Sequence, residues 1–283
     1  MKINLGAGPN WHKDNWHILD HKVKKKQGLK IGGDLNKIKL KSNSCDLVFI
    51  SHTLEHIPNI QIQNVLTEIN RIMKKNSTIR ILVPNLEVLA KAYVKKDKKF
   101  FKIAKDEDHS IRTDLGLGGM FLNFIVSPGQ DTVLLNRNLT NFIAGYAHLY
   151  AYDFNMMKKL LEITGFYQVK KMKFCKSKIS DFREPCHILG RSKKYNNLNN
   201  KFYKKNNLIH EYKNGKYKIN FKFTGFDKDP KTSLIIEAKK KRHIKINKKN
   251  DINASSKNYN NYSFALLKNK NFRKKIIKLK KQK

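Results

Sequence analysis

Residues 46–50 read Asp-Leu-Val-Phe-Ile, and residues 78–83 read Thr-Ile-Arg-Ile-Leu-Val. Each stretch is a short apolar run of the kind that a parallel sheet buries on both faces. Between them, apolar residues recur at three- and four-residue steps and predict a helix with Asn59 as its N-cap: Ile62, Val65, Leu66, Ile69, Ile72 and Met73. A strand, a helix and a strand in this order predict a parallel βαβ unit.

Further strands and helices are predicted on both sides of this unit. The expected strands cover residues 2–5, 16–20, 29–33, 167–174 and 233–238. One expected helix starts near Leu86 and runs past Tyr93, and another opens at Asp153 and is closed by Gly165 as its C′ residue. The pattern favours an α/β protein.

A glycine-containing loop, Gly6-Ala7-Gly8, directly follows the first predicted strand. At the carboxyl end of a sheet strand, glycine lets a ligand reach the backbone, although a tight turn without any ligand explains the same pattern. Only about ten residues separate this strand from the next, which leaves no room for the long helix of a dinucleotide site, and Trp11 stands where the third glycine would be. A nicotinamide or flavin cofactor is therefore disfavoured.

Two aspartates stand at the ends of the following predicted strands. Asp20 ends the second strand, where a carboxylate can accept both hydroxyls of a ribose, and Asp34 ends the third strand in the same manner. The alternative for each is an aspartate in a solvated turn.

Several stretches of the chain, taken in order, resemble the successive motifs of the type 11 group of class I S-adenosylmethionine-dependent methyltransferases. They are Asn-Leu-Gly-Ala-Gly-Pro at 4–9, Trp-His-Ile-Leu-Asp at 16–20, Asp-Leu at 34–35, the segment from Asp46 to His56, and Ile-Arg-Ile-Leu-Val-Pro-Asn at 79–85. The resemblance extends more weakly through 148–153 to the strand at 233–238, and Leu54-Glu55-His56 is its most specific single element.

The resemblance implies a Rossmann-like methyltransferase fold, with a mostly parallel seven-stranded sheet, an antiparallel last strand and flanking helices. It also implies S-adenosylmethionine as the cofactor. Gly6 and Gly8 would pass beneath its methionine part, Asp20 would bind the ribose, and other residues would complete the site. The implied donor-binding set is Gly6, Ala7, Gly8, Asp20, Asp34, Leu35, Ser51 and His52.

The candidate catalytic residues are two histidines, His56 and His148. Methyl transfer from a sulfonium needs alignment and a dry pocket more than a catalytic dyad. If the acceptor is a hydroxyl, however, a base must take its proton, and His56 is the first candidate and His148 the second. A purely structural histidine is the alternative for both. The histidines show no metal-ligand spacing to cysteine or carboxylate, so no metal site is predicted.

Composition bounds the environment of the protein. The chain has 283 residues, a formal net charge of +38 and three widely spaced cysteines. A charge of this size attracts nucleic acid, anionic lipid or acidic saccharides, but lysine is enriched along nearly the whole chain, so a solvated surface without a dedicated ligand explains it equally well. No secretory signal and no apolar run near the roughly 20 residues of a transmembrane helix is seen, which predicts a cytoplasmic protein without a membrane span.

The expected organisation is one methyltransferase domain at residues 1–240 and a basic, disordered tail at 241–283. Within the domain, about 94–150 is expected to form a cap over the acceptor, and about 185–232 is an insertion ahead of the last strand.

The expected activity is methyl transfer to a small-molecule or saccharide acceptor. A nucleic acid or ribosomal acceptor held by the basic tail is one alternative, and the same tail could contact an anionic membrane surface. A non-catalytic binding protein of the same fold is another alternative, because Asn4 replaces a usual acidic residue and Lys75-Asn76-Ser77 a usual glycine turn of the family.

Overall fold

The structure is a computed structural model that describes residues 1–8, 11–21, 23, 28–101, 116–126, 148–186 and 225–244. All of these residues belong to one compact unit, Met1–Ile244. The predicted tail from residue 245 onward, much of the expected cap and the middle of the expected insertion lie outside the described residues.

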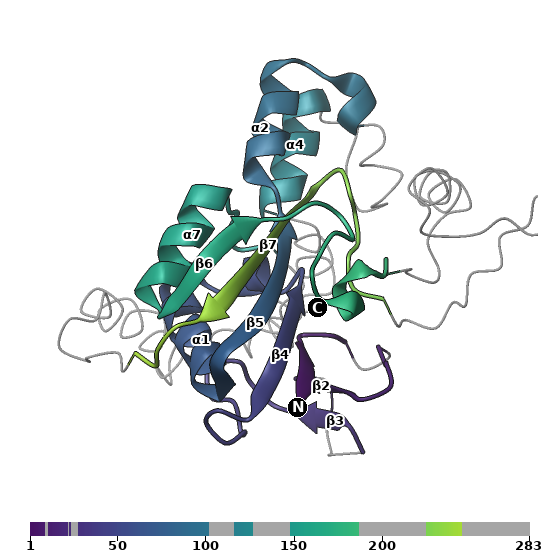
Figure 1. The fold of residues 1–283 in the computed structure, drawn as a ribbon. Helices are drawn as coiled ribbons and strands as arrows, with labels where there is room; N and C mark the ends of the chain where they lie inside the picture. The colour runs from purple at the N-terminus through teal and green to yellow at the C-terminus, as the bar shows by residue number, and fades with distance from the viewer. Residues whose placement is uncertain are drawn as a thin grey trace, which may run out of the picture. The chain divides into compact units, whose positions relative to one another are not determined.

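The elements follow one another along the chain as strands and helices (Figure 1). They are β1 (Lys2–Leu5), β2 (Trp16–Asp20), β3 (Lys30–Gly32), β4 (Cys45–Ser51), the 3₁₀ helix η1 (Leu54–His56), α1 (Asn59–Ile72), β5 (Met73–Pro84), α2 (Leu86–Val94), α4 (Gly116–Val126), α7 (Phe154–Ile163), β6 (Phe166–Lys171), the 3₁₀ helix η2 (Ser180–Arg183) and β7 (Ser233–Lys240). Among the described helices, none is both long and apolar enough to cross a bilayer.

The described strands form one seven-stranded sheet in the order β3-β2-β1-β4-β5-β7-β6. The strands from β3 to β5 are parallel to their neighbours, and β7 runs antiparallel to both β5 and β6. The predicted fold, a mostly parallel Rossmann-like sheet with an antiparallel last strand, is confirmed.

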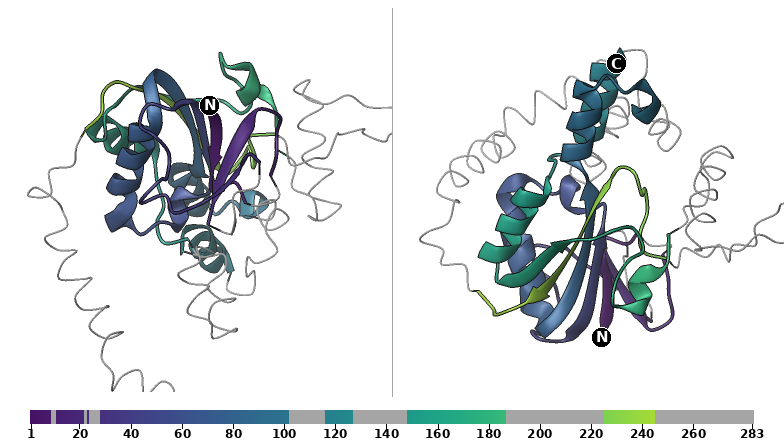
Figure 2. Two further views of the ribbon diagram at one scale, coloured as in Figure 1. Left: turned by 90° about the horizontal axis from the view of Figure 1, so that it is seen from below. Right: turned by 45° about the horizontal axis from the view of Figure 1, so that its top comes forward.

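The two faces of the sheet bury different side chains because successive residues of a strand point to opposite sides. In β4, Val48 and Ile50 join the core beneath α1 and α7, whereas Phe49 joins an aromatic cluster on the other face. Figure 1 and the right view of Figure 2 show α1 and α7 beside each other on the first face. The aromatic cluster draws on segments far apart in the chain: Trp11, Trp16, Phe49, Phe182 and Phe226.

Two helix boundaries were predicted correctly and one cap was wrong. The Asp153 side chain accepts a hydrogen bond of 2.8 Å from the Met156 N–H, and Gly165 follows α7 with a φ of +91°. Asn59, by contrast, is the first residue of α1, and Pro58 is its N-cap without a side-chain hydrogen bond. An asparagine inside the first turn cannot accept from the N–H groups that a cap residue faces, so the predicted cap is corrected.

The strand predicted at 167–174 also ends early, because β6 stops at Lys171. Met172 still donates its N–H to the Ile235 carbonyl at 2.8 Å, but Met172 and Phe174 then pack against the aromatic cluster. Contacts with that cluster, which is assembled from distant residues, therefore take the chain out of the sheet.

Candidate functional site

The site lies where the sheet order reverses. From β1 the chain moves outward through β2 to β3 and then returns to β4 on the other side of β1. At such a switch point the loops after the two central strands turn in opposite directions and leave a crevice at the carboxyl edge. A cavity of about 880 Å³ opens here. Its size is within the range of about 300–1,000 Å³ that is usual for small-molecule sites.

All of the predicted donor-binding residues line this cavity. The loop after β1, the end of β2, the turn after β3 and the end of β4 contribute Gly6, Ala7, Gly8, Asp20, Asp34, Leu35, Ser51 and His52. The structure therefore brings together residues that span almost fifty positions of the chain.

Glycine stands at positions 6 and 8 of the loop for different structural reasons. Gly6 has a φ of +67°, and a Cβ built on it would lie 2.4 Å from the Thr53 side chain. Gly8 has a φ of +74°, and a Cβ there would meet nothing within 4 Å. Gly6 is thus required by close packing, whereas Gly8 borders open space in the cavity wall.

Asp20 braces the glycine loop. Its side chain is nearly buried, and its Oδ2 accepts a hydrogen bond of 2.9 Å from the Gly8 N–H. The carboxylate at the end of β2 therefore fixes the loop at the end of β1 through a backbone contact. Asp34 is exposed and accepts from the Asn36 N–H at 2.8 Å, which is the local turn bond typical of aspartate.

Two other polar side chains of the cavity wall have buried atoms without a hydrogen-bond partner among the described residues. They are Asn4 Oδ1 and Ser51 Oγ. Buried polar groups are normally paired, so atoms such as these in a cavity wall suit a ligand with complementary polar groups. The amino and carboxylate groups of a methionine moiety have that character, and in this respect the wall fits S-adenosylmethionine.

A fully buried carboxylate, Glu55, lies behind the same wall at the centre of a histidine cluster. Its Oε1 is 3.2 Å from His52 Nδ1 and 4.0 Å from His148 Nε2. The rings of His56 and His148 have centroids 4.8 Å apart. Because the Leu149 N–H donates to the Glu55 carbonyl at 2.7 Å, the chain after residue 147 is held against η1.

The cluster includes both predicted catalytic histidines, with one difference in position. His56 lines the cavity, whereas His148 does not line it and instead contacts the His56 ring. Sequence reasoning missed Glu55 as a site residue. Its place between Leu54 and His56 in the most specific motif was the available signal.

Electrostatics keep this carboxylate ionised. Burial alone would raise the pKa of Glu55, but the His52 ring, and then those of His56 and His148, lower that pKa to about 2. Burial, aided by the nearby Lys228 charge, lowers the pKa of His52, which favours its neutral form.

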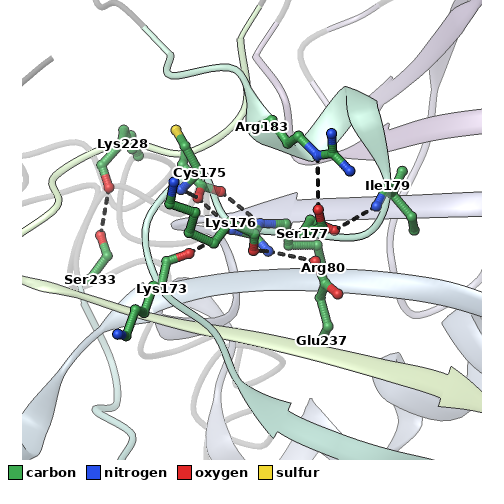
Figure 3. A network of polar contacts seen from close by, with 11 residues as sticks. Arg80, Lys173, Cys175, Lys176, Ser177, Ile179, Arg183, Lys228, Ser233 and Glu237 are labelled. Atoms are coloured by element: carbon green, nitrogen blue, oxygen red, sulfur yellow. Dashed lines mark hydrogen bonds and ion pairs between the residues drawn. The ribbon is translucent and has the colours of Figure 1, made fainter. Parts of the chain in front are cut away.

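The remaining wall comes from the two described ends of the expected insertion. Cys186, Gly225, Phe226 and Lys228 line the cavity. Figure 3 shows how this wall is attached: Ser233 donates to the Lys228 carbonyl, and Arg80 stands at the centre of a network of polar contacts. The sequence carried no recognisable motif for this wall, so these residues were not predicted.

Comparisons with known proteins bear on the first third of the chain and on the fold. The type 11 family model, described as "Methyltransferase domain", matches residues 14–81, which include β2, β3, β4 and α1. No curated protein shows significant sequence similarity to the chain.

Solved structures of low sequence identity are similar to the chain. One is an S-adenosylmethionine-dependent methyltransferase of Thermotoga maritima, described as a possible histamine N-methyltransferase (11% identity, TM-score 0.39, covering 85% of this chain and 82% of that chain). Others come from Archaeoglobus fulgidus (16% identity, TM-score 0.37, covering 84% and 85%) and Mesorhizobium loti (11% identity, TM-score 0.40, covering 84% and 89%).

The family match confirms the predicted resemblance to class I methyltransferases over residues 14–81. It supports S-adenosylmethionine as the cofactor and methyl transfer as the reaction. The matched segment contains Asp20, Asp34 and the Leu54-Glu55-His56 motif, and it begins after the glycine loop.

Proposed function

We propose that this protein transfers a methyl group from S-adenosylmethionine to a small-molecule or saccharide acceptor in the cavity at the carboxyl edge of β1 and β4. The observation that carries the proposal is the convergence of the predicted donor-binding residues on a single cavity at the switch point. A cavity of about 880 Å³ has room for a donor and for a small acceptor or one end of a larger one.

The donor side of the cavity has a role for each polar residue. When bound, S-adenosylmethionine supplies an electrophilic methyl group on a sulfonium. Asn4 Oδ1 would accept from its amino group, and Ser51 Oγ would donate to its carboxylate. Asp20 binds the ribose hydroxyls while it braces Gly8, and the backbone of Gly6, Ala7 and Gly8 passes beneath the methionine part.

Asp34, Leu35 and His52 also line the cavity, where the first two would lie beside the adenine and His52 would close the pocket. Lys228 adds a positive charge to the wall, which suits an acidic group on the acceptor or the carboxylate of the donor.

On the acceptor side, His56 is the residue that takes a hydroxyl proton, because it lines the cavity. The Glu55 carboxylate lies near His56 and stabilises the positive charge that His56 then carries, and His148 contacts the His56 ring. Removing the His56 ring is expected to lower kcat for a hydroxyl acceptor by about 100-fold or more, with donor affinity unchanged.

Donor binding is tested by calorimetry with S-adenosylhomocysteine. The wild-type chain is expected to bind with a Kd of about 1–100 µM, and Gly8→Arg, which places a long side chain in the cavity, is expected to abolish binding. Gly28→Arg is the matched control, since Gly28 also has a positive φ (+54°) and open space around a built Cβ, but it is exposed and outside the cavity wall. Equal binding by wild type and both variants would refute the donor site.

The acceptor class is tested with labelled donor and a whole-cell extract. Label in a saccharide or small-molecule fraction is the expected result, and loss of that label in Gly8→Arg but not in Gly28→Arg ties it to the cavity. Label in RNA, lost when residues 242–283 are deleted, would replace this proposal with the nucleic acid alternative.

A further inference from the structure

The Glu55 carboxylate is a charged group in an unusual position. It is fully buried, and neither oxygen has a hydrogen-bond partner among the described residues. A buried charge is costly unless it is paired, hydrogen-bonded or coordinated to a metal. Whether the negative charge of Glu55 is compensated therefore depends on which nitrogens of the surrounding histidine rings carry a hydrogen.

The hydrogen bonds of His148 orient its ring. Its Nδ1 lies 2.9 Å from the Phe124 carbonyl oxygen, which can only accept, so Nδ1 carries the hydrogen. In the neutral ring the lone pair is then on Nε2, the atom 4.0 Å from Glu55 Oε1. The ring nitrogen nearest to Glu55 therefore carries no hydrogen when His148 is neutral.

His52 repeats this arrangement on the same oxygen. The Ser233 hydroxyl donates to the Lys228 carbonyl at 2.9 Å, so it must accept from His52 Nε2, which is also 2.9 Å away. In the neutral His52 ring the lone pair is therefore on Nδ1, 3.2 Å from Glu55 Oε1. In the neutral rings, neither of these two imidazole nitrogens carries a hydrogen that could offset the charge on Glu55 Oε1, so a cation bound at Glu55 would compensate it.

We propose that Glu55, His56 and His148 bind one divalent transition-metal ion such as Zn²⁺. Each of these residues offers one ligand atom, and the three atoms lie within 4.8 Å of one another. Two imidazoles and one carboxylate are the ligand set of many catalytic zinc and non-haem iron sites. The sequence predicted no metal because His148 is far from Glu55 and His56 along the chain, and only the fold brings it close.

Binding requires a small local closure. Ligand atoms about 2.1 Å from a tetrahedral zinc lie about 3.4 Å apart, so the three side chains must approach by roughly 1 Å. Both rings can turn about their side-chain bonds, while the backbone hydrogen bond from Leu149 to Glu55 keeps the two segments together.

The ion would have an open position toward the cavity, because His56 lines it. That position suits the hydroxyl of an acceptor, and this purpose rests on the proposed methyl transfer. With the ion bound, His56 would be a ligand and not the base, and the ion would acidify the hydroxyl so that its proton leaves to solvent. Metal binding itself does not depend on the proposed methyl transfer. Metal binding is therefore tested with the metal alone.

The test uses the full-length chain after removal of metals with a chelator. Titration with Co²⁺ is expected to give visible absorption that saturates at one equivalent, lacks sulfur-to-cobalt charge transfer and disappears when Zn²⁺ is added. Glu55→Gln and His148→Gln are each expected to lose at least about 100-fold in affinity, more than the 10–100-fold typical for residues that only orient a ligand. His12→Gln, an exposed histidine outside the cluster, is the matched control and is expected to bind as the wild type does.

Thermal unfolding provides an independent measurement. One equivalent of Zn²⁺ is expected to raise the Tm of the wild type and of His12→Gln but not that of Glu55→Gln. If Glu55→Gln does not fold, His148→Gln carries the same comparison. Absence of binding by the wild type, or equal affinity in all variants, would overturn the metal site and would mean that protons alone compensate Glu55. Calorimetry with S-adenosylhomocysteine, run in parallel, shows whether the donor site stands in that case.

Discussion

Asn4 occupies a position at the carboxyl end of β1 where many class I methyltransferases carry an acid. Its side chain is almost fully buried, and its Oδ1 has no partner among the described residues. A neutral amide is less costly to bury without a partner than a carboxylate is. The asparagine therefore favours the stability of the empty protein, whereas an acid would favour contact with the donor amino group.

Exchange of this residue separates the two effects. Asn4→Asp is expected to tighten S-adenosylhomocysteine binding several-fold, because a hydrogen bond to an ionised acceptor is roughly twice as strong as a neutral one. The same variant is expected to have a lower Tm at neutral pH without ligand, and the loss should shrink in acid, where the new carboxyl is neutral. Calorimetry and thermal unfolding measure both, with Asn4→Leu as the control that weakens binding. Weaker binding by Asn4→Asp at unchanged Tm would contradict this account.

At the scale of elements, α1 clamps the segment between β3 and β4. Arg71 donates to the Ile38 carbonyl at 2.7 Å and to the Leu40 carbonyl at 2.8 Å, and Glu68 accepts from the Ile38 N–H at 3.0 Å. Although burial favours the protonated form of Glu68, the Arg71 guanidinium and the Ile38 N–H hold the pKa of Glu68 below its usual range. The helix thus fixes a connection that has little regular structure of its own.

This clamp predicts a pH-dependent loss of stability in Glu68→Gln. Since the pKa of Glu68 is lower in the folded than in the unfolded chain, its contribution is present above its ordinary pKa and is lost as the pH falls through the folded value. The variant is expected to lose about 1–2 kcal/mol in the free energy of unfolding at pH 7 and much less near pH 3. Urea unfolding at both values measures the difference. Glu87→Gln, which breaks an exposed pair with Lys91, should show little change at either pH. A loss of equal size at both pH values would rule out the ionised clamp.

At the scale of the whole molecule, one buried ion pair joins the sheet to the wall of the cavity. Arg80 in β5 donates from Nε to Asp227 Oδ1 at 2.8 Å, and both side chains are fully buried. Arg80 also contacts Glu237 in β7 at 2.6 Å (Figure 3), and the Cys175 N–H donates to Asp227 Oδ2 at 2.7 Å. The network holds the segment that carries Phe226 and Lys228 against the edge of the site.

Breaking this pair is expected to destabilise the fold and to loosen the site together. Asp227→Asn leaves the buried Arg80 guanidinium with only Glu237 of its two carboxylate partners and should cost about 3 kcal/mol in the free energy of unfolding, measured in urea. The double variant Arg80→Met with Asp227→Leu removes both fully buried charges, leaves only the partly exposed Glu237 unpaired, and is expected to lose less. Donor affinity should fall in Asp227→Asn because the wall that carries Lys228 is no longer fixed. A double variant less stable than Asp227→Asn would show that the polar network itself stabilises the protein.

Much of this architecture follows from local patterns in the chain. The apolar strand runs, the helical spacing from Ile62 to Ile72, the Asp153 cap and the Gly165 terminator depend on neighbours a few residues away, and short-range geometry is readable from sequence. The sequence also placed Met73 in the helix, but α1 ends at Ile72 and Met73 begins β5. The predicted donor-binding set also lies together, because parallel strands place their carboxyl ends on one edge. The Asn59 cap failed because two adjacent residues, Pro58 and Asn59, suit the start of a helix, and local pattern does not decide between them.

The sequence by itself therefore determined the order of strands and helices and the edge of the sheet where the candidate site lies. Only the tertiary structure decided which distant side chains meet there: His148 with Glu55, Asp227 with Arg80, and Phe226 with Trp16. The physical reason is the distance along the chain over which each interaction acts. Backbone preferences and periodicity act over a few residues, whereas these contacts join segments more than ninety residues apart and arise only when the two faces of the sheet are packed.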